Sequence, residues 1–115
     1  MIAREQRDFQ AAQQWYQKSL EIKERLGNEH GAASTYGQLG IMAGLQENYV
    51  DSGRWLIKCV ATFLRVNDPH SAQRNTNNFV IFLQQASPEE QAALRRLWDE
   101  AGLPPLPQDE DDGAA

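Results

Sequence analysis

DFQAAQQWYQKSL, residues 8–20, returns forty residues later in altered form as NYVDSGRWLIKCV, residues 48–60. A period of this length is typical of helix-pair repeats, because two helices and two turns make a unit that cannot bury its apolar face alone. The same offset pairs several identical residues: Trp15 with Trp55, Lys18 with Lys58, Arg25 with Arg65, His30 with His70, Ala32 with Ala72 and Ile41 with Ile81.

The first half of the chain carries the signals of two helices. Apolar residues at three-and-four spacing predict an amphipathic helix over residues 8–26. Asp8 is placed to cap its start, and Gly27 most easily adopts the left-handed stop conformation. A second helix is expected from about residue 29 to residue 46, with Asn28 as its cap.

The second half repeats these devices with different residues. Asn48 can cap a third helix, and Asp51 could reach back to it in a capping box. Asp68 followed by Pro69 opens a fourth helix, because proline at the first helical position lacks only an amide hydrogen that would be unpaired anyway. Residues 87–90, SPEE, combine a cap, a first-position proline and an acidic first turn, and open a fifth helix. The sequence predicts an all-α fold.

These residues resemble the tetratricopeptide repeat family, in its bacterial variant of about 40 residues whose units close in a Leu-Gly-Asn or Leu-Gly-Asp turn. Residues 26–28, LGN, match that turn, and residues 36–40, YGQLG, resemble the first helix of the following unit. The spacing of Gly40, Ser52, Leu56 and Cys59 is similar to the family's small and large contact positions. The resemblance implies antiparallel helix-pair repeats stacked as a short right-handed superhelix.

The expected organisation is one repeat domain over residues 1–103. It consists of an incomplete first unit over residues 8–27 and of units over about 28–66 and 68–101. Residues 104–115 combine prolines with an acidic run and cannot bury enough apolar surface to offset their ordering entropy, so we expect a disordered acidic tail.

Charge and hydropathy argue against two classes of partner. The net charge is −5, and removing the four acidic residues at 109–112 leaves −5 + 4 = −1, with no lysine and arginine stripe to attract nucleic acid. The longest run of large apolar residues, 79–83, is far below the ~20 residues that span a bilayer. The N-terminus lacks the apolar stretch of a secretory signal, so we expect a cytoplasmic protein.

No enzyme motif stands out, and we expect no catalytic residue, no metal and no cofactor. His30 and His70 occupy equivalent places in successive units, and neither has a metal-ligand partner at helical spacing. Cys59 falls at a small-residue contact position, where burial would keep the thiol inert. Trp15 and Trp55 recur with the repeat, which favours packing between helices over base stacking.

The resemblance implies a non-catalytic scaffold that binds a peptide or protein partner on a concave face lined by the first helix of each unit. The alternative is a regulatory or sensor repeat segment of a larger bacterial signalling protein. The polar residues of this face could contact a peptide or form only a solvated helix surface. The expected partner-binding residues are Ser34, Ile41, Arg74, Asn77, Asn78, Ile81 and Gln84, with Gly37 and Gly44 on the same face.

The first helix has no preceding partner helix in the sequence. Phe9, Tyr16 and Leu20 belong to it, and repeat units depend on neighbours to cover their apolar faces. We therefore expect a possible homodimer through the N-terminal helix, in which a second copy supplies the cover.

Overall fold

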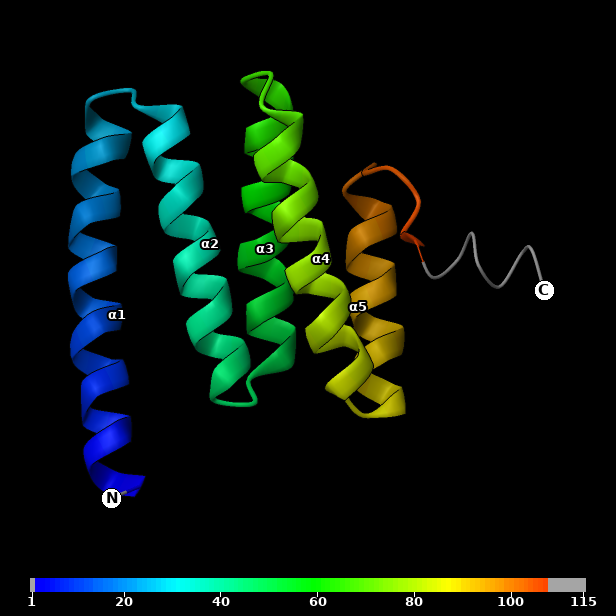
Figure 1. Cartoon of the computed structure of the whole chain (residues 1–115), viewed down its shortest axis with the longest axis horizontal. Coiled ribbons are helices and arrows are strands. Elements are labelled where there is room, and N and C mark those ends of the chain that lie inside the picture. Colours follow the sequence, from blue (N-terminus) through cyan, green and yellow to red (C-terminus); the bar gives the residue numbers. More distant parts are fainter. Residues whose placement is uncertain (1, 108–115) are drawn as a thin grey trace.

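Five α-helices make up the computed structural model, which describes residues 2–107, with side chains described from residue 8 (Figure 1). Successive helices run antiparallel, from α1 at one edge to α5 at the other (Figure 1). The all-α helical repeat predicted from the sequence is confirmed. The helices are α1 (Ile2–Arg25), α2 (Glu29–Leu45), α3 (Tyr49–Arg65), α4 (Pro69–Gln85) and α5 (Pro88–Glu100).

The turns between the first four helices share one conformation. Gly27, Glu47 and Asn67 all have left-handed backbones, with φ values of 71°, 65° and 65°. Gly27 adopts this conformation without a side-chain clash, as predicted, whereas a non-glycine residue does so at a cost. The turns before α2 and α4 are forty residues apart, so the repeat seen in the sequence is also a repeat of backbone geometry.

Three of the helices start with a side-chain cap at the residue that was predicted from the sequence. The Asn28 side chain accepts a hydrogen bond from the Gly31 amide at 2.9 Å, and Asp68 accepts one from the Ser71 amide at 3.1 Å. Ser87 forms a complete capping box with Glu90 at the start of α5. These contacts satisfy amide groups that have no partner within the helix.

One predicted helix start and one predicted side-chain cap were wrong. Helix α1 begins at Ile2, so Asp8 lies inside the helix and does not cap it. The intervening residues are mostly good helix formers with no proline or glycine to stop them. Asn48 precedes α3 without making a side-chain cap hydrogen bond, and Asp51 instead lies 3.7 Å from Arg54.

A close contact in the core joins α2 to α3. A methyl group placed on Gly40 would lie 2.7 Å from Cγ of Leu56 and 3.2 Å from the Ser52 carbonyl oxygen. Ser52, Leu56 and Cys59 are all fully buried. The small and large contact positions inferred from the sequence thus bring these two helices together, and only glycine fits at position 40 without displacing a neighbour.

The C-terminal end of the core is sealed by α5 and by the residues that follow it. Trp98 is buried against Phe79, with ring centroids 4.7 Å apart, and its Nε1 donates a hydrogen bond to the Pro104 carbonyl at 2.8 Å. Leu106 is also buried, at 1% exposure. The prediction that the disordered tail starts at residue 104 was therefore wrong for residues 104–107, because Leu106 contributes apolar area to the core. The acidic run at 109–112 lies outside the described residues.

The two repeated tryptophans have different environments. Trp55 is half-buried and stacks on Tyr36 of α2, with ring centroids 6.0 Å apart. Trp15 is 72% exposed, so the predicted packing role holds for Trp55 and is wrong for Trp15. Within residues 8–107, whose side chains the structure describes, no ring stacks on Trp15 as Tyr36 stacks on Trp55.

Candidate functional site: the groove between α2 and α4

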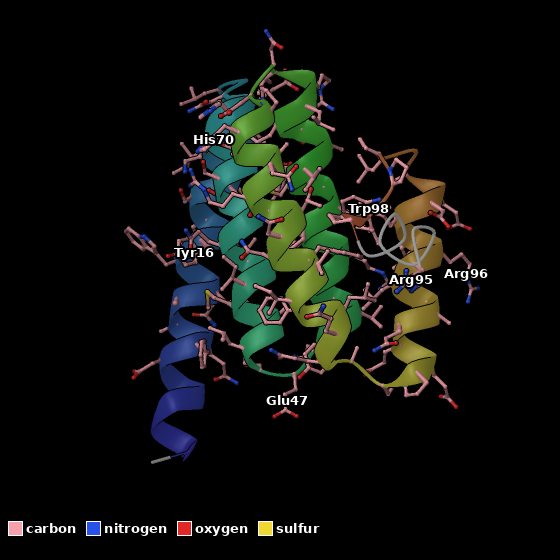
Figure 2. The ribbon with its side chains drawn as sticks, turned by 45° about the vertical axis from the view of Figure 1, so that its right-hand side comes forward. Tyr16, Glu47, His70, Arg95, Arg96 and Trp98 are labelled. Atoms are coloured by element: carbon pink, nitrogen blue, oxygen red, sulfur yellow. The ribbon has the colours of Figure 1, made fainter. Side chains whose placement is uncertain are left out.

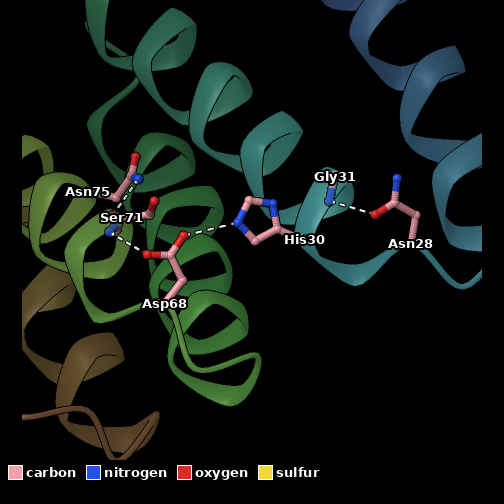
Figure 3. A network of polar contacts seen from close by, with 6 residues as sticks. All are labelled: Asn28, His30, Gly31, Asp68, Ser71 and Asn75. Atoms are coloured by element: carbon pink, nitrogen blue, oxygen red, sulfur yellow. Dashed lines mark hydrogen bonds and ion pairs between the residues drawn. The ribbon is translucent and has the colours of Figure 1, made fainter.

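Polar contacts fasten the starts of α2 and α4 to each other. His30 on α2 lies 3.0 Å from Asp68 at the start of α4 (Figure 3). Nearby, Arg65 at the end of α3 donates two hydrogen bonds to Oε1 of Glu29 on α2, at 2.7 and 3.0 Å. Hydrogen bonds from Ser71, with His30 adding to them, lower the pKa of Asp68 to about 2. Asp68 is thus a carboxylate at neutral pH, able both to cap α4 and to bind His30.

Two glycines on α2 let α4 lie close beside it. A methyl group on Gly37 would lie 2.9 Å from Oδ1 of Asn75, and one on Gly44 would lie 2.5 Å from the Phe82 ring. Asn75 and Phe82 are seven residues apart, as are the two glycines, so the helices meet at two points about two turns apart. These contacts form the floor of a groove.

Two hollows lie along this floor. The one nearer the helix starts has a volume of about 140 Å³, and the other has a volume of about 340 Å³. Both are lined by Ile41 and Asn78, so they join into one groove, which we call the α2–α4 groove. Figure 2 shows the two helices side by side, with His70 near one end of this surface and Glu47 at the other.

The two ends of the groove differ in chemistry. At the polar end, the exposed Arg74 lies with Ser34, Gln38 and Asn78. Among the described residues, Arg74 has no carboxylate partner, so its guanidinium is available to a ligand. At the other end the lining is apolar and open to water, with Leu45 60% exposed and Ile81 48% exposed. An apolar surface beside an unpaired cation suits a ligand with both an apolar and an acidic group.

Five of the seven expected partner-binding residues line this groove, and two do not. Asn77 and Gln84 are exposed but border neither hollow, and Asn77 instead accepts a hydrogen bond from Gln73 at 3.1 Å. Asn77 and Gln84 stand forty residues after Gly37 and Gly44. On α2 these two glycine positions face the contacts with α4. The five expected residues that do line the groove are Ser34, Ile41, Arg74, Asn78 and Ile81.

Nine further lining residues were missed: Gln38, Leu45, Glu47, Tyr49, Phe63, Ser71, Asn75, Phe82 and Gln85. Gln38, Leu45 and Gln85 obey the forty-residue register, but so do positions 37, 44, 77 and 84, so the register alone does not separate the two sets. On α2 the groove stripe is 34, 38, 41 and 45, and on α4 it is 74, 78, 81 and 85, so each position is matched forty residues later. Both stripes follow the three-and-four spacing that defines one face of a helix.

Other candidate reactive groups are held in structural roles. Burial raises the pKa of the Cys59 thiol to about 12, which keeps it protonated and unreactive. Burial, together with a 2.7 Å hydrogen bond to Glu24, raises the pKa of Tyr36 to about 12. Within residues 8–107, no three His, Cys, Asp or Glu side chains are grouped so that they could hold a metal ion. None of the described helices is long and apolar enough to cross a membrane.

Stacked antiparallel helix pairs with a groove between their first helices define a helical-repeat protein. A family model described as tetratricopeptide repeat matches residues 1–63, which is more than half of the 115 residues. The chain belongs to the tetratricopeptide repeat family. Repeats of this family generally mediate protein–protein interaction and are generally non-catalytic. No curated protein and no solved structure matches the sequence.

Proposed function

We propose that this protein is a non-catalytic scaffold that binds a peptide segment of a partner protein in the α2–α4 groove. The observation that carries the proposal is Arg74, which has no carboxylate partner within the part of the chain that the structure describes, in one groove with the exposed apolar side chains of Leu45 and Ile81. Exposed apolar groups that border a polar rim are typical of protein-binding surfaces. The groove runs along two helices, which suits a single peptide segment.

The spacing of the groove residues suggests what the peptide carries. Arg74 and Ile81 are seven residues apart on α4, or about 10 Å at about 1.5 Å per residue. An extended peptide advances by about 3.3 Å per residue, so groups that reach both side chains would be about three residues apart. The favoured ligand therefore has an acidic residue for Arg74 and a large apolar residue about three positions away for Ile81.

Arg74 also provides the specificity of the proposed site. A guanidinium can hold a carboxylate through two parallel hydrogen bonds, and Asn78 and Gln38 can bond to the peptide backbone between the anchors. At the apolar end, Glu47 would repel a second acidic residue. The groove therefore favours one orientation of the peptide over the reverse.

A panel of fluorescent synthetic peptides tests the proposal. Each peptide carries one glutamate and one leucine or phenylalanine, separated by different numbers of residues, and binding is measured by fluorescence anisotropy. We expect the tightest binding when the two groups are about three residues apart. Failure of every spacing to bind would overturn the proposal.

The Arg74→Glu substitution is expected to weaken binding of the best peptide by about tenfold or more, because hydrogen bonds to charged groups contribute ~1.5–3 kcal/mol. Ile81→Ser is expected to weaken it by removing apolar contact. The matched control is Arg96→Glu, which makes the same charge change on a side chain of α5 that points away from the other helices (Figure 2). Equal losses for Arg74→Glu and Arg96→Glu would show a general charge effect and no groove site.

A further inference from the structure

Helix α1 presents a stripe of large apolar side chains to water. Trp15 is 72% exposed, Ile22 55% and Leu26 76%. Their spacings of seven and four place them on one face of the helix, with Ser19 between them. We call these four residues the α1 stripe. It faces away from α2, which is contacted instead by Leu20 and by the Glu24 side chain.

The equivalent stripe on α3 is covered by a helix. Forty residues after the α1 stripe stand Trp55, Cys59, Thr62 and Val66. Cys59 and Thr62 are buried, and Trp55 stacks on Tyr36 of the antiparallel helix α2. A methyl group on Gly37 of α2 would lie 3.2 Å from Sγ of Cys59, so the two helices touch at this small residue. The repeat thus shows that this stripe accommodates an antiparallel helix.

The α1 stripe is complementary to an antiparallel copy of itself. Trp15 lies four residues before Ser19, whereas Ile22 and Leu26 lie three and seven residues after it. With a two-fold axis beside Ser19, Trp15 of each copy enters the space between Ile22 and Leu26 of the other. The small Ser19 at the crossing lets the two helices approach closely.

The charged residues beside the α1 stripe support the same two-fold pairing of the helices. Lys18 and Glu21 are both exposed, and neither has an ion-pair partner among the described residues. The two-fold pairing places Lys18 of one copy opposite Glu21 of the other, so each interface has two such pairs. Exposed pairs of this kind add little affinity but disfavour registers that bring like charges together.

We propose that α1 is a homodimerisation helix, which packs antiparallel against α1 of a second copy through the α1 stripe. The interface is isologous, because the same surface is used by both chains. The α2–α4 groove uses neither the stripe nor its flanking charges, so the proposal does not rest on peptide binding. A dimer built in this way would carry two grooves and bind a partner with two peptide segments more tightly than one groove does.

Light scattering coupled to gel filtration tests the assembly. Two chains of 13.0 kDa give an expected mass of about 26 kDa at submillimolar concentration. Trp15→Glu and Leu26→Glu are expected to return the mass to that of one chain while leaving the helical circular dichroism unchanged, because both side chains are exposed. Ile81→Glu is the matched control, since it adds the same charge to an exposed apolar site outside α1, and this variant should remain dimeric.

Three further variants test the register. Lys18→Glu should weaken the dimer, and adding Glu21→Lys to it should restore the dimer. Ser19→Cys should form a disulfide between copies on mild oxidation, since Cys59 is buried and does not compete.

A wild-type monomer at these concentrations would overturn the proposal and leave the stripe for a helix of another protein. A dimer that Trp15→Glu fails to dissociate, or that Ser19→Cys fails to cross-link, would equally overturn it by placing the interface elsewhere.

Discussion

Replacing Trp98 with alanine is expected to lower the free energy of unfolding by about 3–5 kcal/mol, the usual range for removing a buried aromatic side chain. Trp98 is 2% exposed and is packed against Phe79 in the last layer of the core. Its indole also holds the Pro104 carbonyl, and Leu106 two residues later is buried. The substitution therefore leaves a cavity and also loosens the segment that covers the end of the repeat.

Urea unfolding at a fixed protein concentration measures this loss. Trp98→Phe is the matched control, because it keeps an aromatic ring near Phe79 and removes the indole hydrogen bond. We expect this variant to lose only about 1–2 kcal/mol. If the alanine variant lost no more than the phenylalanine variant, Trp98 would not be the side chain that seals the core.

The second large effect is expected at the contact between Gly40 and Leu56. Leu56→Ala alone should cost about 2–5 kcal/mol, because the side chain is fully buried. Gly40→Ala alone should also destabilise the protein, by up to about 3 kcal/mol, because the new methyl group would lie 2.7 Å from Leu56.

The combination of these two substitutions gives the sharper result. In the Leu56→Ala background, the clash with the leucine side chain is gone and alanine is a better helix former than glycine by ~1 kcal/mol, while the Ser52 carbonyl oxygen remains 3.2 Å from the new methyl group. Gly40→Ala is therefore expected to cost much less in the Leu56→Ala variant than in the original chain. A double-mutant cycle measured by urea unfolding checks this. Equal effects of Gly40→Ala in both backgrounds would contradict the close α2–α3 contact.

Features that depend on local sequence were predicted most accurately. Asp68 with Pro69, and Ser87 with Glu90, fixed the starts of α4 and α5, because a cap and a first-position proline act within a single turn. The forty-residue register also predicted which small residues lie between α2 and α3. The start of α1 was missed because nothing in residues 2–7 ends a helix, and helix formers alone do not mark a boundary.

Features that depend on contacts between distant segments were predicted less well. Composition alone marked residues 104–107 as part of a tail, since one leucine among prolines carries no sign of the pocket that Leu106 fills. Similarly, the groove face of α4 was placed one residue off at two positions. Asn77 and Gln84 share the polarity of Asn78 and Gln85, and only the rotation of α4 against α2 separates them.

The proposal that the α2–α4 groove binds a peptide is tested most directly by nuclear magnetic resonance. The ¹⁵N-labelled protein is titrated with the tightest-binding peptide of the panel, and the amide shifts are followed residue by residue. We expect the largest shifts at Gln38, Ile41, Arg74, Asn78 and Ile81, with little change on the outer side of α5. Shifts concentrated on α5 or on the α1 stripe, with the groove residues unchanged, would contradict the account.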